Sequence, residues 1–571
     1  MKINLIVLGA ALTIGMSLTS CTQDDMLEKN KTEEKEHKNE HLTSFTGGAV
    51  MTRTSITYPK VFKWTSGDKI WVEDDNGVWQ QSTNTIEGGP ETFTPIQEKE
   101  SFTFQVPGQY KNKSSYRVLY LGKGGAGKKI IFASTQQQME PNSGLDVGKY
   151  GDWGMATTSK TPDGNFKFTL QHKAAILCFM PFNGKTELSS TRISKIELTS
   201  DGNIAGTYTL NTTTNQLEDD AVSKTITLNS NSFGGGLFSP SEYRDGFPLS
   251  KTTADMATNG SFVVIKPGAH KLTAKFYLED TGTGTKGVVT KDYGTFTYKE
   301  NTTYNMKVDM EIPNFDQNYY MWDAKQNYWY PHQTGGTEPI WQPWKNGSTS
   351  VGTVNGPESY NANYPKSGDV DRYCNTSFPG DGVRNDAQTE LFKKLPNANE
   401  MAWYVVKGDP HGDRNQLFSF LGHLYKGGMW ILKRQYIAGM NKETAPSELA
   451  PVTDLRVAES GDYAQNTHIP DTPPAKADLH KYFFLPELGW YERGICLNIG
   501  YNGYYWSSSA FAKNSVDGNN TKYAFDLFFR RNSTFGYTIY VESSNRELGC
   551  KAVPFERSRC ACARRRKNLR S

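Results

Sequence analysis

Apolar side chains alternate with polar ones in many short segments of this 571-residue chain. Leu272, Ala274, Phe276 and Leu278 are one example, and the segment 304–312 shows the same strict alternation. A period of two places the apolar residues on one face of an extended strand, so each such segment is predicted as a half-buried β-strand. The continuous apolar run 174–180 is predicted as a strand covered on both faces. A mainly β fold is therefore expected.

The composition agrees with a β-rich body in water. Aromatic residues make up 12% of the chain and 53 positions are glycine, which is typical of strands joined by tight turns. The mean hydropathy is −0.63. No segment after the first 21 residues has the run of about 18 apolar residues that a membrane helix needs. The net charge is +3 and the body of the chain has no basic stripe, so nucleic acid is not expected as a partner.

Changes in composition divide the chain into parts. Residues 21–43 are rich in Lys, Glu and Asn and are predicted to be a flexible tether. Residues 44–185 and 186–312 are each predicted to form a β-sandwich, the second with roughly seven strands. Residues 313–556 contain helix-like and strand-like segments and are expected to form an α+β domain, followed by a basic tail at 557–571.

Two short helices are predicted in the third part. Asn397 is a suitable N-cap and Glu400 lies three residues later, which together predict a helix start. Phe418, Leu421 and Leu424 have helical spacing and predict a second helix that ends before the glycines at 427–428.

The N-terminus has the features of an export signal. Lys2 precedes the mostly apolar segment 3–18, which is too short for a membrane span and is predicted to be a signal peptide over residues 1–20. The sequence Leu-Thr-Ser before Cys21 resembles the bacterial lipobox. That resemblance implies cleavage before Cys21, lipidation of this residue and anchoring in the cell outer membrane. The acids Asp24 and Asp25 resemble the signal that sends lipoproteins of Bacteroidetes-type bacteria to the cell surface. The alternative is an ordinary secretory signal in which Cys21 has no special role.

Four segments of the first two parts resemble fimbrillins, the subunits of the lipoprotein-derived (type V) pili of Bacteroidales. The resemblance covers about residues 45–312 and is carried by 51–54 (MTRT), 64–71 (WTSGDKIW), 201–208 (DGNIAGTY) and 298–304 (YKENTTY). It implies transthyretin-like β-sandwiches and assembly with other pilin subunits by strand donation. It also implies proteolytic maturation between Arg53 and Thr54, which removes the first strand.

The third part resembles the C-type-lectin-like, sulfatase-modifying-factor-like domains that end many Bacteroidales surface proteins. The matching segments are 483–490 (FFLPELGW), 503–509 (GYYWSSS) and 548–553 (LGCKAV). Lys551 and Ala552 stand where the family often has Val-Arg, which is a mild departure. The resemblance implies contact with a glycan or another cell-surface ligand. The calcium-lectin signature is absent from the sequence, so calcium-dependent sugar binding is not expected.

Asp409, His411 and Asp413 form the most site-like short cluster of chemically active side chains. A histidine and two carboxylates within five residues suit metal binding or acid–base work. The alternative is a loop in which the aspartates cap backbone N–H groups while proline and glycine set the turn, and we favour this interpretation.

Aromatic residues provide the other candidate ligand contacts. Tyr505 and Trp506 would stack against a sugar ring if they were exposed, although core packing is the more frequent role of this motif. Trp341 and Trp344 suit an exposed binding loop, although plain packing is the slightly favoured interpretation. No other metal site or cofactor is expected.

The sequence lacks the motifs of the enzymes considered. It has no Gly-x-Ser-x-Gly elbow and no His-Glu-x-x-His. The glycine-rich stretch 122–128 lacks the final Ser/Thr of a phosphate loop and is predicted to be a β-turn. None of the seven cysteines has zinc-ligand spacing, and a disulfide from Cys374 to Cys496 or Cys550 is left open. The chain is therefore not expected to be an enzyme.

These observations predict a surface lipoprotein that acts as a fimbrial tip subunit and adhesin. The tail 557–571 has no apolar alternation and is strongly basic, so it is a poor strand donor. Such a chain would accept a strand without passing one on. The alternatives are a lipid-anchored glycan-binding protein outside any pilus, and the anchor subunit of the pilus.

Overall fold

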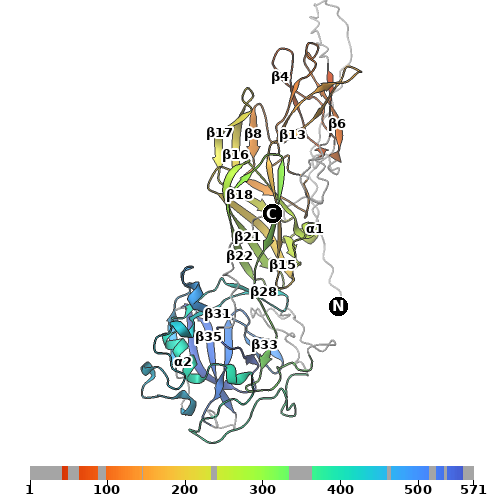
Figure 1. The fold of residues 1–571 in the computed structure, drawn as a ribbon. Coiled ribbons are helices and arrows are strands. Elements are labelled where there is room, and N and C mark those ends of the chain that lie inside the picture. The colour runs from red at the N-terminus through yellow and green to blue at the C-terminus, as the bar shows by residue number, and fades with distance from the viewer. Residues whose placement is uncertain are drawn as a thin grey trace, which may run out of the picture.

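The computed structural model of the protein describes residues 42–48, 63–87, 98–144, 146–232, 241–332, 363–459, 464–513, 522–532 and 536–556. Figure 1 shows an elongated molecule whose parts lie end to end. We call them the N-terminal sandwich, the second sandwich and the C-terminal domain. The prediction of a mainly β chain is confirmed, because strands dominate each part. In the described residues, no helix is both long and apolar enough to cross a membrane.

The N-terminal sandwich packs a four-stranded sheet, in the order β11-β12-β1-β6, against a five-stranded sheet, in the order β13-β10-β7-β3-β4. Phe45, Phe104 and Phe166 of the first sheet share a buried core with Val72 and Val118 of the second. A small β2-β5 pair completes this part. The strands are β1 (Thr43–Gly48), β2 (Trp64–Thr65), β3 (Trp71–Glu73), β4 (Trp79–Gln81), β5 (Glu98–Lys99), β6 (Ser101–Val106), β7 (Arg117–Tyr120), β10 (Gly154–Thr157), β11 (Ser159–Lys160), β12 (Phe166–Thr169) and β13 (Gln171–His172).

The second sandwich is larger and contains three sheets. Their orders are β22-β21-β15-β18-β9 with β19 paired to β15, β20-β14-β23, and β17-β16-β8. Phe179 on β14 and Phe276 on β21 meet edge to face, with ring centroids 5.6 Å apart. The elements are β8 (Lys129–Phe132), β9 (Thr135–Gln137), β14 (Ala175–Phe182), β15 (Leu188–Ser200), β16 (Ala205–Asn211), β17 (Gln216–Ser223), β18 (Thr225–Asn229), η2 (Ser241–Tyr243), β19 (Phe247–Leu249), α1 (Met256–Asn259), β20 (Ser261–Ile265), β21 (Gly268–Asp280), β22 (Lys286–Tyr298) and β23 (Thr302–Asp309).

The strand pairing departs from the expected domain boundary at 185/186. β8 pairs with β16, β9 pairs with β18, and β14 pairs with both β20 and β23. Residues 129–137 and 175–182 therefore lie in the second sandwich, although they precede the expected boundary. A change in composition along the chain can only separate consecutive segments. Parallel strand partners such as β14 and β23 must lie far apart in the sequence, so their pairing crosses such a boundary. The prediction that 174–180 is a strand covered on both faces is confirmed, since β14 is buried over nearly its whole length.

The C-terminal domain combines a six-stranded sheet, in the order β25-β37-β34-β35-β36-β30, with smaller sheets β24-β27-β28, β26-β29-β31 and β32-β33. Helix α2 buries Met401, Ala402 and Val405 in one core with Leu527 and Ile539 of the large sheet. The elements are β24 (Asn314–Phe315), β25 (Tyr319–Tyr320), η3 (Phe392–Lys394), α2 (Ala398–Lys407), β26 (His411–Gly412), β27 (Leu417–Phe420), β28 (His423–Lys426), β29 (Gly428–Leu432), η4 (Arg434–Tyr436), η5 (Ser447–Leu449), η6 (Leu455–Val457), β30 (Ala464–Ile469), η7 (Leu479–Lys481), β31 (Tyr482–Pro486), β32 (Trp490–Glu492), β33 (Ile495–Leu497), β34 (Asn502–Ala510), β35 (Tyr523–Asn532), β36 (Gly536–Asn545) and β37 (Cys550–Lys551).

One of the two helix predictions is confirmed and the other is wrong. The Asn397 side chain caps α2 and Glu400 completes the reciprocal capping box. Residues 417–426 form the β27–β28 hairpin instead of a helix. Leu421 and Gly422 link its strands with φ angles of 52° and 76°, the backbone that a two-residue hairpin turn requires. The glycine-rich stretch 122–128 contains a β-turn as expected, in which Gly125 N–H donates to the Gly122 carbonyl at 3.2 Å.

Candidate functional site

Strand β1 occupies the interior of its sheet, although it lies at the start of the described chain. It pairs antiparallel with β6 along its whole length and parallel with β12 over residues 45–48. Phe45 lies opposite Phe104 on β6 and Phe166 on β12. We call the space that β1 fills between β6 and β12 the β1 slot. Without a strand in this slot, the backbone donors and acceptors of β6 and β12 that face it would be unpaired.

Phe45 anchors β1 in the core of the N-terminal sandwich. Its side chain is fully buried. The ring stacks on Phe166 with centroids 5.1 Å apart and meets the Tyr110 ring edge to face at 4.9 Å. Trp64 closes the other end of the slot, because its indole N–H donates to the Gly47 carbonyl at 3.1 Å. Burying an aromatic ring in such contacts stabilises the strand far more than a solvent-facing residue would.

The opposite face of β1 is polar. The Thr46 hydroxyl lies 2.9 Å from the Thr103 hydroxyl, and Ser44 lies beside Gln105. Thr46 and Gly48 line a cavity of about 1320 Å³, whose wall also includes Gln216 and Pro267 of the second sandwich. The inward face of β1 therefore holds the strand by apolar packing, while the outward face borders a polar cavity.

The residues predicted for lipidation and cleavage, Cys21, Arg53 and Thr54, lie outside the described residues, so their roles stay predictions. The described chain stops at Gly48 and resumes at Lys63. Arg53 thus follows the end of β1 by five residues in the sequence.

The last strand of the described chain is held inside a sheet. β37 lies between β25, close to the start of the C-terminal domain, and β34. Lys551 is buried, and its ammonium donates to the Asp316 carboxylate at 2.7 Å and lies 4.7 Å from the centre of the Tyr319 ring. Burial lowers the pKa of Lys551 against the opposing effect of Asp316. The two ends of the C-terminal domain are therefore tied together.

The predicted Asp409–His411–Asp413 cluster is not one site in the structure. The Asp413 carboxylate accepts from the backbone N–H groups of Asn415 and Gln416 and from the indole of Trp430. Asp409 instead accepts from the Tyr482 hydroxyl at 2.6 Å and lies 3.4 Å from His411 Nε2. Within the described residues, no group of at least three His, Cys, Asp or Glu side chains is placed to hold a metal ion.

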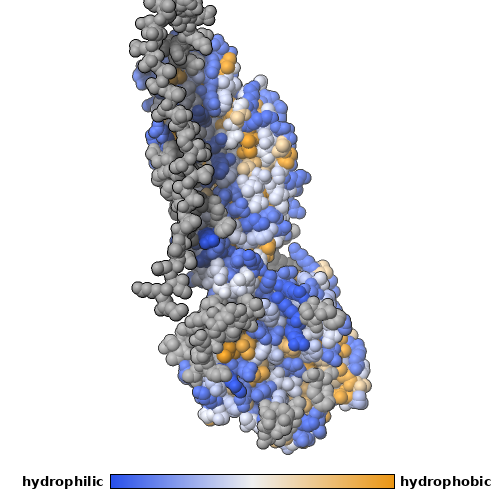
Figure 2. All heavy atoms as spheres, turned by 180° about the vertical axis from the view of Figure 1, so that it is seen from behind, coloured by the Kyte–Doolittle hydropathy of each residue, from blue (hydrophilic) through white to orange (hydrophobic). Residues whose placement is uncertain are grey.

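The predicted aromatic contacts divide into two sets. Tyr505 and Trp506 are buried; the Tyr505 hydroxyl donates to the Pro486 carbonyl at 2.6 Å and the Trp506 indole to the Tyr320 carbonyl at 2.8 Å. Neither ring presents a face to a ligand in this structure. Trp341 and Trp344 lie outside the described residues. Figure 2 shows hydrophobic residues only in small groups on the described part of one face of the molecule.

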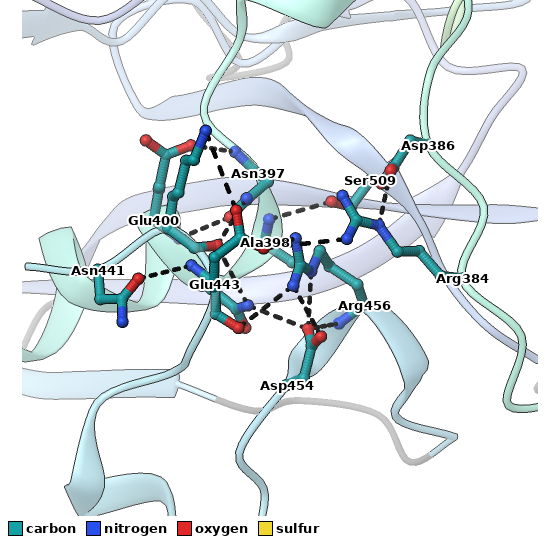
Figure 3. Close-up of polar contacts among 12 residues, drawn as sticks. Arg384, Asp386, Asn397, Ala398, Glu400, Asn441, Glu443, Asp454, Arg456 and Ser509 are labelled. Atoms are coloured by element: carbon teal, nitrogen blue, oxygen red, sulfur yellow. Dashed lines mark hydrogen bonds and ion pairs between the residues drawn. The ribbon is translucent and has the colours of Figure 1, made fainter.

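A polar network near the N-terminus of α2 was not predicted from the sequence. Arg456 has only 4% of its side chain exposed and binds Asp454 at 2.8 Å and Glu443 at 3.0 Å (Figure 3). Asn399 on α2 donates to the same Asp454 carboxylate. These contacts hold the segment that follows Asn441 against the helix. No local sequence signal marks Asn399 and Asp454, which are 55 residues apart, as partners.

The buried cysteines make no disulfide. Cys178, Cys374, Cys496 and Cys550 are all buried, and none of them forms a disulfide among the described residues. Burial raises the pKa of the Cys374 thiol to about 12. The disulfide left open between Cys374 and Cys496 or Cys550 is therefore absent from the structure.

No family model matches the sequence, and neither does any curated protein. Similar solved structures include a "putative cell adhesion protein" from Bacteroides ovatus ATCC 8483, with 14% identity over 47% of this chain and 91% of that chain and a TM-score of 0.26. The fimbrial anchor protein Mfa2 from Porphyromonas gingivalis has 11% identity over 44% of this chain and 83% of that chain, with a TM-score of 0.20. A fimbrial assembly protein from Parabacteroides distasonis ATCC 8503 has 8% identity over 43% of this chain and 98% of that chain, with a TM-score of 0.18. These neighbours are adhesion and fimbrial proteins, but scores this low assign no role to any residue of this chain.

Proposed function

We propose that this chain is a surface-exposed fimbrial subunit that accepts a strand from another pilin and ends the polymer as a tip adhesin. The observation that carries the proposal is the position of β1. The strand is internal to its sheet, is paired on both sides, and precedes the Arg53–Thr54 sequence that resembles a fimbrillin maturation site. Cleavage there would free β1 to leave and would open a slot that another strand can fill by ladder hydrogen bonds.

The C-terminal domain supports the terminal position. A donor must offer an extended segment that is not already used in its own fold. Here the last described strand, β37, is flanked by β25 and β34, and the buried Lys551 on it is paired with Asp316, whose side chain is exposed. Pulling β37 out would separate Lys551 from Asp316, remove the strand from the core of the domain and leave two sheet edges unpaired, which is strongly unfavourable. The chain therefore accepts a strand without supplying one.

The role is one of binding, not catalysis. The C-terminal domain, whose sequence resembles C-type-lectin-like domains, would contact a host or bacterial surface glycan or protein. Before maturation, lipid on Cys21 would hold the precursor at the outer membrane. In that case Cys21→Ala should abolish palmitate labelling, while Cys178→Ala, which removes a buried thiol, should retain it.

The N-terminus of the mature protein tests the proposal directly. Edman sequencing of protein from sheared pili should begin at Thr54. Arg53→Ala should block this cleavage, whereas Lys60→Ala, in the same segment, should leave it intact. A mature chain that still begins at Cys21 would favour the anchor subunit or the lipid-anchored glycan-binding protein over the tip adhesin.

The position in the polymer needs a second experiment. Immunogold labelling with antibodies against the C-terminal domain should mark the distal end of each pilus once. Labelling along the shaft would contradict the terminal role, and labelling of the bare outer membrane alone would favour the protein that never joins a pilus.

A further inference from the structure

The β1 slot demands a large side chain at one inward position. Phe45 fills this position, fully buried between the rings of Phe166 and Tyr110 at centroid distances of 5.1 Å and 4.9 Å. A replacement strand with a small residue there would leave a cavity lined by aromatic rings. Such cavities are costly because close-packed surroundings collapse only partly.

Two residues further along, the slot has no room for any side chain. A Cβ atom added at Gly47 would lie 2.7 Å from Cζ of Phe168 and 2.8 Å from Cζ2 of Trp64. Both rings are themselves buried, and the Trp64 indole is fixed by its hydrogen bond to the Gly47 carbonyl. Neither ring can retreat without disturbing the core, so the position accepts only glycine.

The next position along β1 provides a contrast. A Cβ atom added at Gly48 would meet nothing within 4 Å. Ser44 and Thr46 lie on the same outward face and contact the polar side chains of Gln105 and Thr103. The selection is therefore confined to the inward positions 45 and 47.

We propose that the β1 slot accepts, from another pilus subunit, an extended strand that carries an aromatic residue and, two positions later, a glycine. This inference rests on the proposed function, because β1 must leave before another strand can enter. The ladder hydrogen bonds to β6 and β12 are independent of sequence, whereas the pockets for alternate side chains provide the specificity. Trp64 and Phe168 exclude strands with any other residue at the second inward position.

The same pair of positions fixes the register of the incoming strand. A shift by one residue would turn the aromatic side chain to the polar outward face. A shift by two residues toward the glycine end would place that ring against Trp64 and Phe168, where not even a methyl group fits. The aromatic residue thus enters at the Phe45 position, with the strand antiparallel to β6 as β1 is now.

A peptide exchange experiment tests the inference. The chain spanning residues 22–571 is cut by an arginine-specific protease until sequencing shows Thr54 as the N-terminus of the body, and the released segment is removed. Fluorescent peptides with the sequence of residues 41–50 are then added, as the parent and as Phe45→Ala, Gly47→Ala and Gly48→Ala versions. Fluorescence anisotropy gives the affinity of each, with uncut protein as the control in which the slot is already filled.

The parent and the Gly48→Ala peptide should bind with affinities within about twofold of each other, since the added methyl group meets open space. The Gly47→Ala and Phe45→Ala peptides should each bind at least about tenfold more weakly. Equal binding of all four peptides would overturn the motif while leaving strand acceptance intact. If Gly47→Ala and Gly48→Ala weakened peptide binding equally, the cause would be the loss of backbone flexibility, and the proposed motif would also be overturned. Failure of the parent peptide to bind the cut protein would overturn the proposed function together with the inference.

A second measurement does not depend on cleavage. In the uncut chain, Gly47→Ala should lower the urea midpoint of the N-terminal sandwich, whereas Gly48→Ala should leave it unchanged. Equal midpoints for these two variants would contradict the shape of the slot itself.

Discussion

The carboxylate of Asp280, at the end of β21 in the second sandwich, lies 3.1 Å from Nδ1 of His423 in the C-terminal domain. The same carboxylate accepts from Leu424 N–H at 3.0 Å, and the Thr283 hydroxyl donates to the Leu424 carbonyl at 2.8 Å. Leu417 and Leu424 of the β27–β28 hairpin belong to the hydrophobic core of the second sandwich. The C-terminal domain is therefore fixed to the sandwich by a buried polar joint surrounded by apolar packing.

Replacing Asp280 should destabilise this joint. The side chain is fully buried and also accepts from Gly282 N–H and Thr283 N–H, so Asp280→Ala leaves several buried donors without a partner. We expect a loss of about 3–5 kcal/mol in the free energy of unfolding, measured by urea denaturation of the full chain. Asp292→Asn is the control, because Asp292 is exposed on the next strand and accepts from the Thr273 hydroxyl. Equal losses of unfolding free energy in the two variants would contradict a stabilising role of the joint.

The joint should also weaken in acid. Burial opposes ionisation of Asp280, but the hydrogen bond from His423 and those from the backbone lower its pKa overall. A carboxyl group whose pKa is lower in the folded state stabilises the fold above its unfolded value of about 4, and this contribution is lost as the pH falls through the folded value. The difference in unfolding free energy between the parent chain and Asp280→Asn should therefore be largest near neutral pH and should shrink below about pH 4. If the difference in unfolding free energy between these two proteins stayed constant from pH 7 to pH 3, the lowered pKa of Asp280 would be contradicted.

The network beside α2 offers a matched pair of arginines. Arg456 has 4% of its side chain exposed and bridges Asp454 and Glu443, whereas Arg384 has 46% exposed and binds Asp386 at 2.6 Å. Arg456→Met should lower the free energy of unfolding by about 2–4 kcal/mol, because it leaves the Asp454 carboxylate without its cation. Arg384→Met should change it by less than about 1 kcal/mol. Thermal denaturation of both variants measures the two losses of stability. A larger loss for Arg384→Met than for Arg456→Met would contradict the prediction.

Local signals in the sequence predict only part of this fold. The Asn397–Glu400 spacing gave the start of α2 correctly because a capping box is made within four residues. The spacing of Phe418, Leu421 and Leu424 failed, because Leu421 with Gly422 makes a hairpin turn whose positive φ angles override the helical spacing. Residues 44–185 were predicted to form a β-sandwich, but nothing in the order of residues along the chain indicates that β1 is inserted beside β12.

The candidate site shows the same division. The Gly-Gly pair after Phe45 is visible in the sequence, but the need for glycine at 47 and not at 48 depends on the Trp64 and Phe168 rings, which come from other strands. The partnership of Asp316 with Lys551 spans 235 residues. Contacts of this length depend on how the sheets assemble, so no pattern within a short window could have revealed them.

The basic tail provides the last prediction. The final described strand, β37, ends at Lys551, between β25 and β34, so the residues that follow it are not needed to complete the sheet. If the chain ends the polymer, deleting residues 557–571 should leave pilus number and the single distal immunogold label unchanged, because no later subunit draws on this segment. The arginines and the lysine there would also need to be desolvated to enter an apolar slot, which costs several kcal/mol. A control deletion of residues 43–48 should prevent correct folding of the precursor, since it empties the β1 slot before any partner is present.

If only the tail deletion abolished the polymer, residues 557–571 would donate a strand after all, and the chain would then lie within the shaft.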